Sequence, residues 1–481
     1  MEQSRLAQYL QAAVSLHRMQ LLDPAETYYR QALLLQPDHL QAKENLVLLL
    51  GQKGNIPEAL QLFPEVFLRH PQKLECLLNV LRLLMMRSLF KEVSKVLKDY
   101  IPFLLDQTAS LNKLGIFLQM HNLDEEAIAL YRKVLTHWPK HVDALSNMGL
   151  ALVDRGEYEE ALSCLNQAIE LNPEHFNARS NRALLYLLLG MYQQGWDEYG
   201  AYRKADGYQK PKGLMGPLWE GEDLQGKTIL LLCEQGAGDA IQFVRYAPLF
   251  QRRGARVLLA CQPGLMTLFS QSPGVDVAID ATKPFPPHDT HFFLMMAPKL
   301  FGVDPAEDSS AFPYLFVQDH LHDKWRKQVQ SISGRKIGVA WAGNPKHRKD
   351  LFRSLDPSLL DPLWAVEDCV FVSLQKSHPI PFPPMIDWTS LLSDFAETAA
   401  LILQLDLVIT VDTSIAHLAA ALGKEVFILL PFVPDWRWRL HGSTTPWYPS
   451  VRLFRQKTRG DWSSVLEEVK LALEEMGAIR R

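Results

Sequence analysis

Up to about residue 205, apolar positions recur with the spacing of amphipathic helices, and this helical pattern itself repeats every 34 residues. The clearest unit, 142–175, predicts two helices joined by a turn at Arg155–Gly156. Prolines close four of the units, at Pro37, Pro71, Pro139 and Pro173. One position of the repeat is alanine or glycine in every unit except one, where it is valine: Ala25, Ala59, Val93, Ala127, Ala161 and Gly195. Helical pairs of this kind stack on their neighbours, so the pattern predicts an α-helical superhelix.

These features resemble the tetratricopeptide repeat (TPR). We define residues 1–205 as the repeat domain. Its units are placed at 6–39, 40–73, 74–107, 108–141, 142–175 and a divergent 176–209. The concave face of such an array usually binds an extended peptide or a partner helix, so a protein or peptide is the expected partner. The alternative is a structural or dimerising spacer, and a homo-oligomer is compatible with the sequence.

Asparagines occupy the sixth position of four units, on the first helix: Asn45, Asn79, Asn147 and Asn181. Side-chain amides both donate and accept hydrogen bonds, so a ladder of them can pair with an extended backbone of any sequence. Lys113 interrupts this ladder in one unit. The alternative is that asparagine is simply common at this position of the repeat. We therefore name these four residues as candidate acceptor-binding residues.

The remaining chain alternates short apolar runs with helical patterns. Residues 206–226 contain five glycines and two prolines and are interpreted as a linker, in which Leu218 and Trp219 dock on a flanking domain. Strands are predicted at 229–233, 255–261, 275–280, 290–296, 336–343, 371–375, 407–412 and 425–430. Helices are predicted at 265–272, 319–330, 394–404, 414–422 and 463–476.

This alternation indicates parallel sheets, in two successive blocks. We expect two Rossmann-like lobes, 227–333 and 334–455, with a cleft between them and a C-terminal helix in 456–481. Ligands of such sheets bind beyond the carboxyl ends of the strands. Candidate functional residues therefore belong at those strand ends.

Composition narrows the class of protein. The 481 residues carry a formal net charge of −4, with 47% hydrophobic and 22% charged residues, as in a soluble globular protein without general affinity for nucleic acid. The five cysteines lack metal-ligand or redox spacing. The N-terminus has no apolar signal-peptide core, and no apolar run approaches ~20 residues, so a cytoplasmic protein without a transmembrane segment is expected.

The first lobe opens with the apolar strand 229–233 and a glycine turn at Gly236 and Gly238, with a helix predicted to begin at Asp239. Glycine lets the backbone approach a ligand closely, and a helix start offers free N–H groups. A carboxylate there either caps the helix or faces a cleft and takes a proton. Both roles of Asp239 remain open on these grounds.

The second lobe offers three strand ends. The first leads into a loop that contains Asn344 and Ser354 and a run of positive charges: Lys346, His347, Arg348, Lys349 and Arg353. This loop either binds a diphosphate or is a solvated basic loop. Gln375 and Lys376 close the second strand and are candidates to contact a nucleotide base. The third leads to Asp412, Thr413 and Ser414, whose hydroxyls cap a helix or form an anion site, with His417 one turn further. His417 is either a packing residue or a ligand.

The sequences GAGD at 236–239 and DTSIAHLAAALG at 412–423 resemble the ADP-heptose lipopolysaccharide heptosyltransferase family. The resemblance covers about 227–455 and implies the two-lobed GT-B fold and inverting transfer from a nucleotide sugar. It implies that Asp239 is the catalytic base, beside Gly238. It implies donor contacts from Asp412, Thr413 and His417, and diphosphate contacts from the loop around Arg353.

The repeats are not part of that family, and the layout is similar to protein O-GlcNAc transferase. The combination implies a glycosyltransferase with a protein acceptor, with flagellin as a candidate, and leaves heptose as the donor sugar open. No Asp-x-Asp motif is present, so neither a cofactor nor a metal is expected beside the nucleotide-sugar co-substrate.

In the loop 431–440, Trp436 and Trp438 either stack on the donor or pack against the rest of the protein. The alternatives are a non-catalytic scaffold, a glycan or lipopolysaccharide acceptor, and a nucleotide-sugar epimerase.

Overall fold

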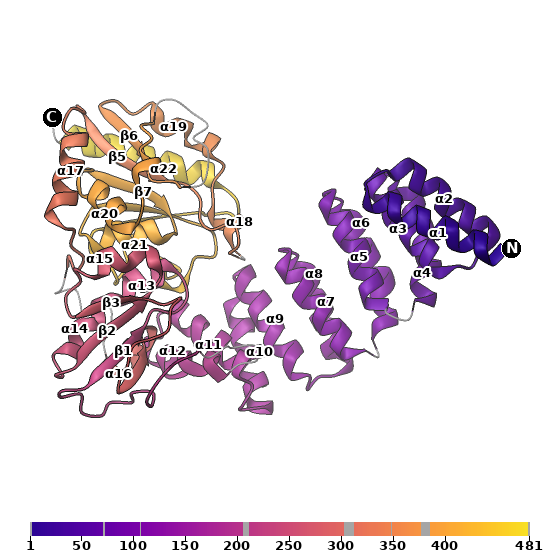
Figure 1. Cartoon of the computed structure of the whole chain (residues 1–481), viewed down its shortest axis with the longest axis horizontal. Coiled ribbons are helices and arrows are strands. Elements are labelled where there is room, and N and C mark those ends of the chain that lie inside the picture. The colour runs from indigo at the N-terminus through magenta and orange to yellow at the C-terminus, as the bar shows by residue number, and fades with distance from the viewer. Residues whose placement is uncertain are drawn as a thin grey trace. The chain divides into compact units, whose positions relative to one another are not determined.

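The computed structural model of the protein describes residues 2–70, 73–105, 107–204, 211–302, 312–347, 349–376 and 385–479 (Figure 1). The chain divides into two compact units, Met1–Leu171 and Asn172–Arg481. Pro71, Arg348 and the beginning of the predicted linker, 206–210, lie outside the described residues. Helical repeats are followed by parallel sheets, which confirms the predicted fold class at this level.

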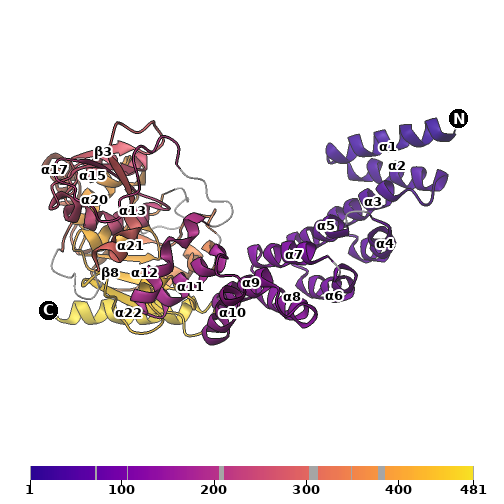
Figure 2. The same ribbon diagram turned by 90° about the horizontal axis from the view of Figure 1, so that it is seen from below.

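The first unit is built from antiparallel helical pairs. Figure 2 shows the first helices α5 and α7 on one side of this array and the second helices α6 and α8 on the other. The helices are α1 (Glu2–Arg18), α2 (Leu22–Leu35), α3 (Leu40–Lys53), α4 (Ile56–Arg69), α5 (Lys73–Met86), α6 (Phe90–Tyr100), α7 (Thr108–Met120), α8 (Asp124–His137), α9 (Val142–Arg155) and α10 (Tyr158–Leu171).

Local signals set where these helices begin and end. The imidazoles of His39 and His141 cap α3 and α9 by accepting a hydrogen bond from a backbone N–H of the first turn, at 3.2 Å in each case. Gly54 and Gly156 end the same two helices in the left-handed conformation, which glycine adopts without strain. Equivalent caps therefore recur in separate repeats.

Close packing within a repeat depends on the small residues of the pattern. A Cβ atom at Gly149 of α9 would lie 2.7 Å from Cγ of Leu165 in α10, well inside normal contact distance. Ala161 is fully buried against the same pair of helices. The recurring small residues thus allow the two helices of a unit to approach each other.

The second unit begins with the helical pair α11 (Phe176–Leu188) and α12 (Tyr192–Tyr199) and continues with two all-parallel sheets. One sheet has the order β3-β2-β1-β4 and the other the order β6-β5-β7-β8-β9. The strands are β1 (Thr228–Leu232), β2 (Arg256–Cys261), β3 (Val277–Asp280), β4 (Thr290–Phe293), β5 (Arg335–Ala340), β6 (Cys369–Ser373), β7 (Leu407–Val411), β8 (Val426–Leu430) and β9 (Val451–Arg455). We call the parts built on these sheets the first and the second lobe.

Helices and short turns connect the strands. In the first lobe they are α13 (Ala237–Phe243), α14 (Ala247–Gln251), α15 (Met266–Phe269) and α16 (Ala297–Phe301). The second lobe has α18 (Asp350–Arg353), α19 (Asp361–Trp364), α20 (Phe395–Leu403), α21 (Ser414–Ala421), the short helix η9 (Trp436–Trp438) and α22 (Trp462–Ile479). Between the lobes in sequence lies α17 (Asp319–Val329), which joins the second lobe through Trp325, whose indole N–H donates to Glu397 of α20 at 2.5 Å.

The predicted linker is partly ordered against the first lobe. Trp219 is 2% exposed, and its backbone N–H donates to the carbonyl of His291 in β4 at 2.9 Å. Leu218 forms an isolated bridge with the same residue. The docking predicted for these two residues is confirmed.

The helical pair α11–α12 packs on the two lobes rather than standing apart from them. Trp196 meets Trp436 of η9 and Phe243 of α13 with ring centroids 5.5 and 6.2 Å apart. Arg439 donates from Nε to the hydroxyl of Tyr192 at 2.9 Å. The helical pattern counted as the last repeat therefore contributes to the core of the second unit.

Candidate functional site

The first strand end supplies Asp239. The helix α13 begins at Ala237 with Gly236 as its N-cap, so the prediction of a helix starting at Asp239 was two residues late. Oδ2 of Asp239 accepts a hydrogen bond from the backbone N–H of Gly236 at 2.8 Å. One carboxylate oxygen thus caps its own helix, which is the first of the two roles considered for this residue.

The second strand end supplies Asp412, Thr413 and Ser414. Thr413 is the N-cap of α21, and its Oγ1 accepts from the backbone N–H of Ile415 at 3.3 Å. Arg353 of α18 donates from Nη1 to the carbonyl of Asp412 at 3.1 Å. The predicted hydroxyl cap is present, and a positive charge lies directly beside it.

The two strand ends meet. Helices α13 and α21 lie side by side between the sheets (Figure 1), and a Cβ atom at Gly238 would lie 2.9 Å from Cδ2 of His417 and 3.5 Å from Cα of Ser414. Only glycine allows the backbone of α13 to approach α21 this closely. The structure therefore brings Gly236, Gly238 and Asp239 together with the Asp412–His417 segment.

His417 is a buried imidazole. It is 4% exposed, it stacks on Trp438 with ring centroids 5.3 Å apart, and its Nδ1 is hydrogen bonded to the hydroxyl of Tyr448 at 2.8 Å. Burial, and then the charges of Arg437 and Arg245, lower the pKa of His417 well below its ordinary value. Its packing role is observed, and a contact of His417 with a donor remains a prediction.

Arg437 was missed from the sequence, although it reaches Asp239. Its Nη2 donates to Oδ1 of Asp239, its Nε to Oε1 of Gln242 at 2.5 Å, and its Nη1 to Oδ1 of Asp435 at 2.9 Å. The guanidinium also lies 4.2 Å from the ring centre of Trp436. The alternating aromatic and basic residues of the loop after Asp435 were the available signal, since such cations often stack on aromatic rings.

Asp412 lies in the same neighbourhood. Burial first, and then the negative charge of Asp435, raise the pKa of Asp412 to about 6, against the opposing charges of Arg353 and Arg437. Carboxylates and guanidinium groups from both lobes therefore converge at the meeting point of α13 and α21.

The basic loop folds back on the end of β5. Ser354 accepts a hydrogen bond at Oγ from the backbone N–H of Gly343 at 2.9 Å, and Arg353 pairs with Asp350 at 3.0 Å. Asn344 and His347 lie on an exposed turn, where each accepts a hydrogen bond from a backbone N–H two residues later. Arg353 is thus in contact with the segment that leads into α21.

Gln375 has a structural contact that its position at a strand end did not suggest. It is buried, and its Oε1 accepts from the backbone N–H groups of Trp341 and Ala342 at 3.0 and 2.8 Å. The side chain thereby joins the end of β5 to the end of β6. A contact to a nucleotide base remains a prediction.

The loop tryptophans pack within the protein. Trp438 is fully buried beside His417, and Trp436 contacts Trp447 and Trp196. Of the two roles considered for them, packing is the one observed.

The predicted ladder residues lie on the first helices and are half-buried. Asn45 accepts from Gln41, Asn79 accepts from Arg82 at 2.9 Å, and Asn147 donates to Asn112 at 2.5 Å. Asn181 lies on α11, in the second unit. These contacts orient three of the amides.

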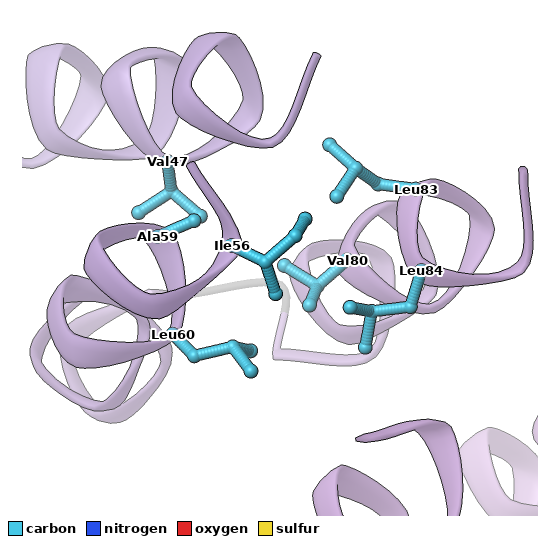
Figure 3. Close-up of a pocket in the computed structure, with 7 residues that line it drawn as sticks. All are labelled: Val47, Ile56, Ala59, Leu60, Val80, Leu83 and Leu84. Atoms are coloured by element: carbon cyan, nitrogen blue, oxygen red, sulfur yellow. The ribbon is translucent and has the colours of Figure 1, made fainter. Parts of the chain in front are cut away.

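A cavity in the array does not offer a ligand site. Its volume is about 10 Å³, which is room for roughly one water molecule. Figure 3 shows its apolar lining from α3, α4 and α5: Val47, Ile56, Ala59, Leu60, Val80, Leu83 and Leu84. The cavity is best described as a packing gap between neighbouring repeats.

The described part of the chain lacks both a metal-binding cluster and a membrane-spanning helix. It holds no group of three or more His, Cys, Asp or Glu side chains placed to bind a metal ion. Within the same residues, none of the helices combines the length and the apolar character that crossing a bilayer requires. The expectation that no metal is needed stays a prediction.

The fold and the site define a class: helical repeats joined to a two-lobed α/β domain whose strand ends face each other. Residues 9–39 match the tetratricopeptide repeat model, and residues 149–190 match a related TPR model. Residues 392–459, which include the Asp412–His417 segment and Arg437, match glycosyltransferase family 9 (heptosyltransferase). The chain therefore combines tetratricopeptide repeats with a segment of the family 9 glycosyltransferase type.

Particular relatives can also be named. Protein FlbA of Caulobacter vibrioides is 29% identical over 329 residues, which are 60% of this chain and 54% of that protein. The chain thus spans about half the length of this curated relative. A family 9 glycosyltransferase structure from Veillonella parvula covers 55% of this chain and 100% of its own, at 11% identity and a TM-score of 0.39. The TPR protein YrrB, described with an unusual peptide-binding site, covers 37% of this chain and 91% of its own, at 22% identity and a TM-score of 0.23.

Proposed function

We propose that the protein transfers a glycosyl group from a nucleotide sugar to a hydroxyl group of a protein acceptor. The observation that carries the proposal is the meeting of α13 and α21, which places Asp239 of one lobe beside the Asp412–His417 segment of the other. The family 9 match over that second segment supports the same activity. The proposed fold type is GT-B, and the proposed compartment is the cytoplasm.

The proposed reaction is a single displacement that inverts the anomeric centre. The acceptor oxygen forms a bond to the anomeric carbon while the bond from that carbon to the diphosphate oxygen breaks. Asp239 takes the proton of the hydroxyl group. An ionised carboxylate accepts about four hydrogen bonds, and the contacts with Gly236 and Arg437 leave two of these sites for the acceptor.

The leaving diphosphate requires positive charge and N–H donors. Arg353, placed beside the start of α21, supplies a guanidinium, and the helix start at Thr413 and Ser414 supplies a favourable dipole. His417 offers Nε2 to the donor. In this scheme protein groups balance the diphosphate charge, so we expect chelation of divalent ions to leave the rate unchanged.

The repeats are proposed to deliver the acceptor. The oriented amides of Asn45, Asn79 and Asn147 suit an extended peptide backbone, and flagellin is one candidate acceptor. Replacing these three residues by alanine is expected to abolish transfer to protein and to leave hydrolysis of the donor unchanged. Intact-mass analysis of the acceptor and release of free nucleotide measure the two reactions separately.

The test of the activity is a panel of UDP-, GDP-, ADP-, dTDP- and CMP-linked sugars. One donor class should raise the melting temperature of the protein and release free nucleotide. Asp239→Asn should retain the thermal shift and lose turnover. If turnover survives in this variant, Asp239 is not the base. If no donor binds, the proposed activity is refuted.

A non-catalytic scaffold is the second candidate, because the Asp239 carboxylate also has a structural role, pairing with Arg437 and capping its own helix. Donor binding without any turnover in the wild-type protein would favour it. A third outcome, transfer to a glycan or to lipopolysaccharide but not to protein, would retain the activity and change the acceptor.

A further inference from the structure

Arg437 joins the second lobe to the first through one buried guanidinium. The residue is 6% exposed and belongs to η9 of the second lobe, yet two of its hydrogen bonds go to α13 of the first lobe, at Asp239 and Gln242. The third goes to Asp435 beside it in the chain. The planar fork of arginine meets all three acceptors in one fixed geometry, whereas the compact ammonium group of lysine has no such fixed fork.

Aromatic rings and a carboxylate surround this guanidinium. It lies on the ring of Trp436, and that ring is enclosed by Trp447 and by Trp196 of α12. The carboxylate of Asp435 also accepts the backbone N–H of Arg437 at 3.1 Å, which fixes the turn. The position of Arg437 is therefore set by rigid neighbours before any substrate arrives.

Stability alone does not explain such an arrangement. Removing charges from water is costly, and buried ion pairs are often no more stabilising than apolar residues of similar size. What the pair does provide is geometry, since it fixes one oxygen of Asp239 while the N–H of Gly236 fixes the other.

We propose that Arg437 is a positioning residue for the transfer reaction and acts through Asp239. It holds the carboxylate in one orientation, so that the unused lone pairs meet the acceptor hydroxyl group. This inference rests on the proposed function. It adds a residue from the second lobe to a catalytic group of the first, so that the base is complete only when both lobes are in register.

A double-mutant cycle tests the proposal. The assay is nucleotide release from whichever sugar of the panel the wild-type protein turns over. Arg437→Met is expected to lower kcat by about 100-fold, the typical effect of a small misplacement, and to leave the donor KM nearly unchanged. In the Asp239→Asn background the same substitution should have no further effect on the residual rate of nucleotide release, because Arg437 then has no base to position. Arg437→Lys keeps the charge and should restore part of kcat.

A matched control is Arg182→Met. Arg182 of α11 forms a partly buried bidentate ion pair with Glu198 of α12, from Nε at 2.9 Å and from Nη2 at 2.5 Å. Loss of this ion pair should leave kcat unchanged. Should Arg437→Met fail to fold, the cycle is run with Arg437→Lys. The proposal would be overturned if the losses of kcat in the Arg437 and Asp239 single variants multiplied in the double variant. It would also be overturned if Arg437→Met raised the donor KM and left kcat unchanged. No turnover of any donor by the wild-type protein would overturn the proposed function, and with it this inference.

Discussion

Gly238 is predicted to be a packing glycine at the contact between the lobes. An alanine methyl group there would lie 2.9 Å from Cδ2 of His417, about 0.6 Å inside the shortest favourable carbon–carbon distance. The imidazole cannot yield easily, because Trp438 and Tyr448 hold it. Overpacking of this kind costs about 1–3 kcal/mol, against a gain of up to ~1 kcal/mol from alanine in a helix.

The net expectation for Gly238→Ala is a loss of about 1–2 kcal/mol in the second unit. For a domain of this size the melting temperature should fall by about 2–6 °C. Differential scanning calorimetry of the full chain measures it, provided that the transitions of the two units are analysed separately.

Gly264→Ala is the matched control. Gly264 also faces the second lobe, but a methyl group there would lie 3.7 Å from the ring of Phe395, an ordinary contact distance. This variant should melt within about 1 °C of the wild type, as expected for a change near ±0.5 kcal/mol. Equal melting of Gly238→Ala and the wild type, or an equal drop in both variants, would refute the packing argument.

Three other predictions concern stability. Gln375→Leu leaves two backbone N–H groups at the end of β5 without an acceptor and should cost about 2–4 kcal/mol in chemical denaturation, whereas an unchanged midpoint would contradict the observed contacts. The pKa of His417 is lowered in the folded state, so below pH ~6.5 only the unfolded chain gains its proton. The free energy of unfolding of the wild type should therefore fall on acidification by up to ~1.4 kcal/mol per pH unit relative to His417→Gln. Parallel pH profiles of the two proteins would contradict this. A chain that begins at Asn172 should melt like the second unit of the full protein. A chain that begins after Lys204 lacks the buried Trp196 and should be less stable by about 3–5 kcal/mol. Equal melting temperatures of the two chains would show that α11 and α12 are dispensable.

Local patterns made much of the fold predictable. The 34-residue period predicts the helical pairs because each pair is formed by residues close in sequence. Eight of the strands lie where the apolar runs indicated, whereas β9 was missed because Arg452 and Arg455 break its apolar character. The start of α13 was misplaced because Asp239 caps the helix from inside its first turn.

The candidate site was predictable only where topology decides position. Asp239 and Asp412 both follow parallel strands, so their placement at strand ends follows from the fold. The pairing of Arg437 with Asp239 spans 198 residues and depends on how the two lobes pack. The direction of the Gln375 side chain, toward backbone rather than toward a cleft, likewise depends on neighbours that no local pattern reveals.

The packing of α11 and α12 on the lobes also has an evolutionary consequence. The boundary between the two compact units falls after Leu171, at the end of one repeat, rather than at the end of the helical region. Whole repeats before that point can be gained, lost or exchanged without touching the contacts of Tyr192 and Trp196 with η9 and the residue that follows it. The length of the array can therefore change without disturbing the unit that the last helical pair forms with the sheets.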